Sequence, residues 1–172
     1  SRIRYLPMFL LRILHRADQF RRAIFARVAE EEIAEVSSVL SPSELQLFLR
    51  MSIVDQRHSI DVYYTSLKIL EDYPDADSNL TKKAVLLHDL GKSCFKVSLL
   101  DRVLATFPQK LVKFFFPWKA KHVFDYKYLH PTYSAEMVLD ERIRDWVKVH
   151  YEQVNEQDPP ELKVLKISDS LN

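Results

Sequence analysis

Hydrophobic residues recur every three to four positions along most of the chain, which is the spacing of amphipathic helices. Early stripes are Phe20, Ile24, Val28 and then Ile33, Val36, Leu40. Further helical patterns cover residues 53–70, 80–90, 99–107, 111–116, 131–139 and 141–151, and Pro159 and Pro160 open a last helix. No run shows the strict apolar–polar alternation of a half-buried strand. The pattern therefore predicts an all-α fold.

Capping signals set some of the expected boundaries. Ser41-Pro42-Ser43-Glu44 reads as a capping box, with Ser41 as the N-cap, Pro42 in the first turn and Glu44 three positions on. Gly91 follows the helix expected over 80–90, in the position where many helices end. It is the one glycine among 172 residues, and such scarcity argues against a sheet protein with many tight turns.

Composition bounds the fold further. The chain is 47% hydrophobic and 28% charged, an ordinary globular mixture that excludes a disordered or collagen-like chain. We expect a single-domain helical bundle over residues 41–172, with residues 1–40 forming a basic N-terminal helical extension that packs on the core.

No segment reaches the ~18–20 apolar residues of a membrane span, and Arg12 interrupts the apolar run near the start. One cysteine, Cys94, allows no intramolecular disulfide, so we expect a cytoplasmic protein.

Histidines and aspartates supply the candidate chemistry. The residues are His58, His88, Asp89, His130, His150 and Asp169. Imidazole and carboxylate are ligands for divalent transition metals such as Fe, Mn, Co, Ni or Zn. Several of them sit in or after apolar helical stripes, so we expect them to face inward from different helices. Taken singly, however, a histidine on an apolar helix face is more often a core residue with its hydrogen bonds satisfied.

The order of these residues resembles the HD-domain superfamily of metal-dependent phosphohydrolases, over about residues 50–172. The resemblance rests on Arg57-His58-Ser59, on the run from Leu86 to Lys92, and on Asp169 in the last helix. It implies an HDIG-type six-ligand site. One ion would be held by His58, His88, Asp89 and Asp169, and a second by Asp89, His130 and His150. The alternative is a mononuclear site in which His130 and His150 position the substrate.

The same resemblance implies hydrolysis of a phosphate ester or anhydride, with a nucleotide as the expected substrate. A metal-activated hydroxide would attack, Asp89 would be a catalytic residue, and Lys92 would neutralise phosphate charge. Lys92 equally suits capping of the helix C-terminus. No Gly-Tyr-Pro follows His150, so cyclic-di-GMP hydrolysis is not supported, and the segment before His130 departs from the diadenosine tetraphosphate hydrolases. The competing hypothesis is a non-catalytic HD module that binds a nucleotide signal, a protein or a membrane.

The net charge of +1 is a cancellation. Residues 1–28 hold seven Arg against one Asp, and residues 92–129 hold eight Lys or Arg against two Asp. The second segment mixes these cations with aromatic residues. It could be a lid in which Trp118 or Phe116 stacks on a base, a membrane or partner face shared with residues 1–28, or ordinary packing. Duplex nucleic acid is not an expected partner. The sequence is compatible with an oligomer as well as with a monomer.

Overall fold

The computed structural model describes residue 21 and residues 25–172, and this part of the chain folds as helices without a β-strand. The all-α prediction is thereby confirmed. The helices are α2 (Glu30–Val39), α3 (Pro42–Leu49), α4 (Ile53–Ile69), α5 (Ser78–Leu87), α6 (Leu99–Ala105), α7 (Gln109–Phe115), α8 (Pro117–Met137), α9 (Glu141–Val149) and α10 (Pro160–Ser170), with 3₁₀ turns η1 (Leu70–Asp72) and η2 (Leu90–Cys94). Among the described residues, no helix is both long enough and apolar enough to cross a membrane.

Side-chain caps explain where several helices begin. The predicted capping box is present: Glu44 N–H donates to Ser41 Oγ at 3.3 Å, and Ser41 N–H donates to Glu44 Oε2 at 2.7 Å. Ser52 and Asp77 cap α4 and α5 in the same way, by accepting from a backbone N–H three residues on. Each cap satisfies a donor that the first helical turn leaves without a backbone partner.

The expected N-terminal extension is described only in part. Its first residues, with the predicted stripe at Phe20 and Ile24, lie outside the described residues. Helix α2 buries Val36 in the main core, and Arg57 of α4 donates to Glu32 of α2 at 2.8 Å. Helix α2 thus packs on the bundle, while the boundary at residue 40 stays a prediction.

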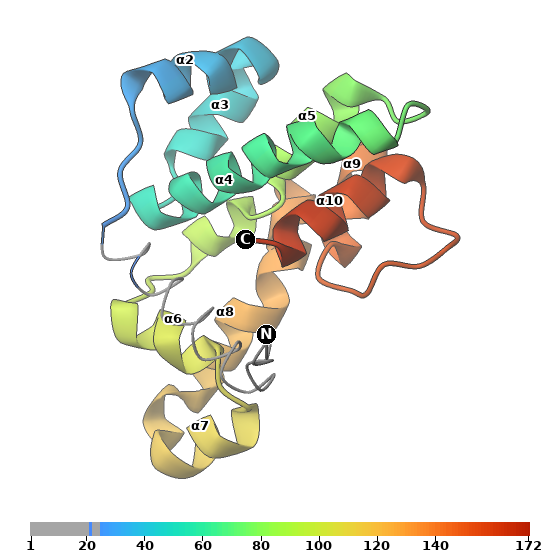
Figure 1. Ribbon diagram of the computed structural model, residues 1–172. Helices are drawn as coiled ribbons and strands as arrows, with labels where there is room; N and C mark the ends of the chain where they lie inside the picture. The colour runs from blue at the N-terminus through green and yellow to red at the C-terminus, as the bar shows by residue number, and fades with distance from the viewer. Residues whose placement is uncertain (1–20, 22–24) are drawn as a thin grey trace, which may run out of the picture.

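Helix α5 is the centre of the main core. Ala84, Val85, Leu86 and Leu87 are consecutive and all are buried, so the last turn of the helix is apolar on every side. Such a helix needs neighbours all round, and α2, α3, α4, α9 and α10 all contact it (Figure 1). The chain therefore delivers the residues that follow Leu87 into the interior of the bundle.

A second, smaller core holds α6, α7 and the first half of α8 together. It consists of Leu104, Val112, Ala120 and Val123, with Phe116 packed against it. These helices lie at the end of the molecule opposite α2 and α3 (Figure 1). Helix α8 runs on from this small core to η2 and α9, and so belongs to both parts of the fold.

The predicted helix over 131–139 was wrong at its start. Pro131 lies inside α8, which begins fourteen residues earlier at Pro117. The buried positions of α8 are small or polar in large part, and they include Ala120, Tyr126, His130 and Ser134. They lie on one stripe at helical spacing, but a search for hydrophobic periodicity passes over such a stripe. The remaining sequence signal was Pro131. Proline is favourable at the start of a helix, so it suggested a helix start, but here it is tolerated in the helix interior.

The end of α5 also differs from the prediction. The helix stops at Leu87 rather than Leu90, and Gly91 lies in η2 without a positive φ. Glycine is needed here for another reason. A Cβ on Gly91 would lie 2.1 Å from the carbonyl oxygen of His130 and 2.6 Å from the backbone nitrogen of Ser134. The absence of a side chain lets η2 lie directly against α8, and Gly91 N–H donates to Ser134 Oγ at 2.7 Å.

We expect Gly91→Ala to destabilise the protein, because the methyl group would meet backbone atoms that cannot rotate away. Overpacking of this kind costs about 1–3 kcal/mol, and the upper end is expected here. The free energy of unfolding, measured in urea, tests this. Cys94→Ala is the matched control, since Cys94 is in the same turn but exposed. Equal stability of the two variants would contradict the proposed close approach.

Candidate metal centre

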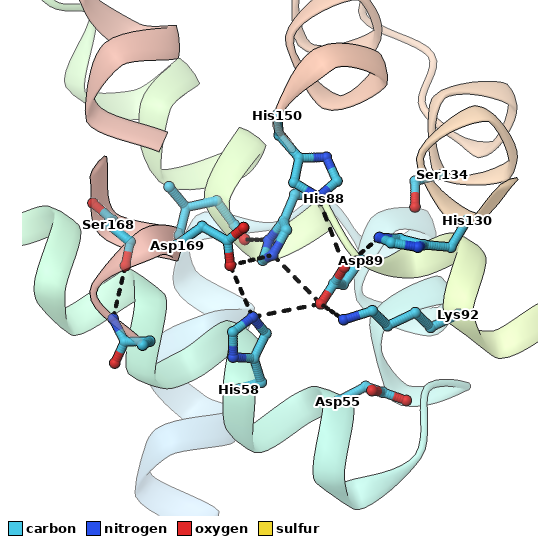
Figure 2. A network of polar contacts seen from close by, with 12 residues as sticks. Asp55, His58, His88, Asp89, Lys92, His130, Ser134, His150, Ser168 and Asp169 are labelled. Atoms are coloured by element: carbon cyan, nitrogen blue, oxygen red, sulfur yellow. Dashed lines mark hydrogen bonds and ion pairs between the residues drawn. The ribbon is translucent and has the colours of Figure 1, made fainter. Parts of the chain in front are cut away.

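The six predicted residues converge in the interior of the bundle (Figure 2). His58 lies in the middle of α4, His88 and His150 are the C-cap residues of α5 and α9, Asp89 follows His88, His130 is on α8 and Asp169 is on α10. Five different helices thus contribute to one cluster. The expectation that these side chains face inward from different helices is confirmed.

Asp89 stands between two groups of histidines. Its Oδ2 lies 3.6 Å from His58 Nε2 and 3.4 Å from His88 Nε2. Its Oδ1 lies 3.3 Å from His130 Nε2 and 4.0 Å from His150 Nε2. One carboxylate therefore offers a different oxygen to each pair of imidazoles.

Asp169 joins the first of these groups. Its Oδ1 is hydrogen-bonded to His58 Nε2 at 3.0 Å and lies 3.6 Å from His88 Nε2. The side chains of His58 and Asp169 are 28% and 26% exposed, whereas Asp89 is 1% exposed. The cluster is therefore reached from solvent beside α4 and α10.

Backbone carbonyls orient three of the imidazoles. In His88, His130 and His150 the Nδ1–H donates to the main chain and leaves Nε2 directed at Asp89 or its neighbours. The acceptors are Val85 O at 2.7 Å, Tyr126 O at 2.9 Å and Val147 O at 2.6 Å, respectively. A hydrogen bond at one ring nitrogen leaves the lone pair of a neutral imidazole on the other, which is how metal-ligating histidines are held.

Two buried polar atoms at the middle of the cluster have no hydrogen-bond partner, His88 Nε2 and Asp89 Oδ1. Leaving such atoms unsatisfied is costly, so a native structure requires a reason for them. Ligand atoms of three triads also lie within 4.8 Å of one another: His58/His88/Asp89, His88/His150/Asp169 and Asp89/His130/His150. A divalent cation would satisfy the unpartnered atoms, and the donor set of imidazole and carboxylate fits one.

The electrostatics of the cluster favour a cation. Burial alone would raise the pKa of Asp89, yet His88 and Lys92 hold it well below its usual value. For Asp169, the hydrogen bond from His58 and the nearby charge of His88 likewise outweigh burial and keep the pKa well below its usual value. Burial lowers the pKa of His88, but the two carboxylates outweigh it and raise the pKa to about 9. Burial and the neighbouring His88 lower the pKa of His150 to about 3. A metal ion would therefore compete with a proton on His88.

Lys92, in the 3₁₀ turn η2, lies beside the cluster. Its Nζ donates to Asp89 Oδ2, and the side chain is 17% exposed. Burial would lower the pKa of the ammonium, but Asp89 and Asp55 raise it. Lys92 is thus a positive charge next to the carboxylate.

The sequence interpretation missed a polar network behind Lys92. Asp55 is buried and accepts two hydrogen bonds from Arg102, at 2.7 and 2.9 Å, and Arg102 also donates to Tyr126 OH at 3.1 Å. Ser134, which contacts Gly91, was missed as well. The one available signal was the spacing of Tyr126, His130 and Ser134, which places them on one face of a helix.

Comparison with known proteins agrees with this geometry. A family model described as HD domain matches residues 56–172, which is more than half of the chain and includes all six clustered residues. Neither a curated protein nor a solved structure matched the chain.

We expect the amount of bound metal to fall by different extents when a shared ligand and a ligand of one group are replaced. Asp89→Asn should remove nearly all bound metal, because both groups share this carboxylate, whereas His130→Ala should remove about half if two ions bind. Plasma emission spectroscopy on protein reconstituted with Mn²⁺ or Fe²⁺ measures this. Asp145→Asn, an exposed aspartate on α9, is the control. Full metal occupancy in Asp89→Asn would contradict the metal centre.

Proposed function

Because the chain belongs to the HD superfamily of metal-dependent phosphohydrolases, we propose that it hydrolyses a phosphate ester or anhydride of a nucleotide at this centre. The observation on which the proposal depends is the buried Asp89 carboxylate, whose two oxygens face different pairs of histidines. Such a carboxylate can serve two metal ions at once. A mononuclear site would use one of its oxygens.

The proposed ligands divide between two ions. His58, His88, Asp89 and Asp169 would hold the first, and Asp89, His130 and His150 the second. When bound, such ions supply Lewis-acid activation of water and charge neutralisation of the phosphate. The unpartnered His88 Nε2 and Asp89 Oδ1 support this division, since one atom lies in each group.

Lys92 is the residue that we assign to the substrate phosphate. Its ammonium already lies beside the first ligand group, and Asp55 and Asp89 keep it protonated. A phosphate at the partly exposed side of the centre, beside His58 and Asp169, would be near this cation. An ammonium is a compact point charge that can donate to a phosphate oxygen. Asp55 and Arg102 would act through Lys92, as positioning residues.

An aromatic side chain supports a nucleotide as the substrate. Tyr151 follows His150, is 59% exposed, and its ring centroid lies 6.3 Å from that of His150. An exposed ring beside the ligands offers a face on which a base can stack.

A phosphate-release panel over nucleotides, dinucleotides and simple esters tests the activity, with Mn²⁺, Fe²⁺, Co²⁺ or Ni²⁺ added. We expect turnover by the wild type and none by Asp89→Asn. Lys92→Gln should lower kcat/KM by about 10- to 100-fold, because one charge-assisted contact worth about 1.5–3 kcal/mol is lost. Metal content should stay unchanged in Lys92→Gln, and Lys96→Gln, an exposed neighbour, is the control. Tight nucleotide binding without turnover under any of these metals would instead indicate a binding module.

Tyr151→Ala should raise KM for a nucleotide by about 5- to 100-fold, since stacking of a base on an aromatic side chain is worth about 1–3 kcal/mol. Tyr151→Phe should retain the wild-type KM, because the ring is kept. Steady-state kinetics with a nucleotide and with a small alkyl phosphate separate stacking from a general effect. An equal change for both substrates would argue against stacking.

A further inference from the structure

Three aromatic side chains project from the end of the molecule formed by α7 and the start of α8. Phe114 is 77% exposed, Phe115 61% and Trp118 74%. We call these three residues the aromatic tip. Leu111, on the same helix as the two phenylalanines, is 48% exposed. Single exposed apolar residues are common, but large ones grouped in this way mark an interaction site.

The small core does not use these residues. Val112 and Ala120 face inward with Leu104 and Val123, and Phe116 packs against them. The packing hypothesis for this segment is therefore right for Val112 and Phe116, and it leaves the aromatic tip unexplained. On one side of α7, the apolar side chains of Phe114 and Phe115 therefore face solvent rather than the core.

The aromatic tip also lies far from the metal centre. Trp118 and His130 are on the same helix and twelve residues apart, which corresponds to about 18 Å of helix rise. Figure 1 shows α7 at the end of the molecule away from α4 and α10, which carry the partly exposed ligands His58 and Asp169. A lid in which Trp118 stacks on a base bound at the metal centre does not suit this arrangement, and Phe116, the other ring of the lid hypothesis, packs against the small core. The aromatic tip is placed to contact something outside the molecule.

Positive charge surrounds the aromatic tip. Lys110, Lys113 and Lys121 are exposed, and no acidic residue occurs between Asp101 and Asp125. Asp101 is buried and accepts from Lys119, and Asp125 accepts from Lys121. Within the described part of the chain, Lys110 and Lys113 have no carboxylate partner. The outward charge of this end is therefore positive.

We propose that the aromatic tip inserts into the interface of a bilayer that carries anionic lipids. Tryptophan and phenylalanine suit the boundary between headgroups and acyl chains. Lysines that flank them can pack their stems on the apolar surface and place their ammonium groups among anionic headgroups. One partner would thus bury the exposed rings and pair with the ammonium groups of Lys110 and Lys113.

Two observations favour a bilayer over other partners. The rings of Phe114 and Phe115 meet edge to face, with centroids 4.9 Å apart, so they form one apolar knob rather than open parallel faces for stacked bases. The chain's other basic stretch, residues 1–28 with seven Arg and one Asp, has the same sign of charge. It is not a complement for the aromatic tip, but it is attracted to the same anionic surface.

Co-sedimentation of the full chain with vesicles tests the proposal. We expect binding to vesicles of phosphatidylcholine with 30% phosphatidylglycerol, weaker binding at 0.5 M NaCl, and little binding to phosphatidylcholine alone. Changing Phe114, Phe115 and Trp118 together to Ala should lower the partition coefficient at least tenfold, and K110E with K113E should do the same. Leu139→Ala is the matched control, because Leu139 is 83% exposed but outside this end.

A second measurement separates the aromatic tip from residues 1–28. In a Trp146→Phe variant, Trp118 is the remaining tryptophan, and brominated lipids should quench its fluorescence on binding. Unquenched Trp118 in vesicle-bound protein would overturn the proposal and assign binding to another segment. So would wild-type binding by the triple variant. A wild type that is a dimer and does not bind vesicles, together with a monomeric aromatic-tip variant, would identify a second copy of the chain as the partner instead.

Discussion

A carboxylate removed from water is the constraint on which the rest of this structure depends. Asp89 is 1% exposed and stays ionised, and an isolated buried charge would be prohibitively costly. Its compensation comes from histidines and a lysine on several helices, so those helices must meet at fixed distances. The bundle is therefore organised around a polar centre, and its apolar core serves to hold that centre in place. Removing one partner would leave charge uncompensated.

The ends of helices do much of this positioning. His88 and His150 are both C-cap residues, and each donates Nδ1–H to a carbonyl three residues back in the last turn. Carbonyls at the end of a helix lack intrahelical donors, so they are free to accept these bonds. A single arrangement thus satisfies the helix end, fixes the tautomer of the imidazole and directs Nε2 inward. Gly91 completes the arrangement, since only a residue without a side chain lets η2 approach α8 closely enough for His130 to face Asp89.

The parts of this structure that were predictable from sequence are those with a local signal. The capping box at Ser41, the apolar run of α5 and the ordered histidines and aspartates each have one, and each led to the right element or the right cluster. Helix α8 has no hydrophobic stripe of this kind, because its buried positions include Ala120, Tyr126 and Ser134, whose burial is decided by packing. Gly91 was expected to end a helix, yet the atoms that require it belong to residues 130 and 134. Asp55 and Arg102 form a pair across 47 positions, and no spacing rule connects them.

The continuity of α8 connects the two ends of the molecule physically. Its N-terminal half is held by the small core that presents the aromatic tip, and its C-terminal half bears His130 and contacts η2. Since one helix spans both, the separation between Trp118 and the metal centre is set by helix geometry, at about 18 Å along the axis. A bilayer bound at the aromatic tip would consequently leave His58 and Asp169, on α4 and α10, facing the aqueous side. The near-zero net charge is the sum of an excess of cations in residues 1–28 and 92–129 and an excess of acidic residues in the rest of the chain.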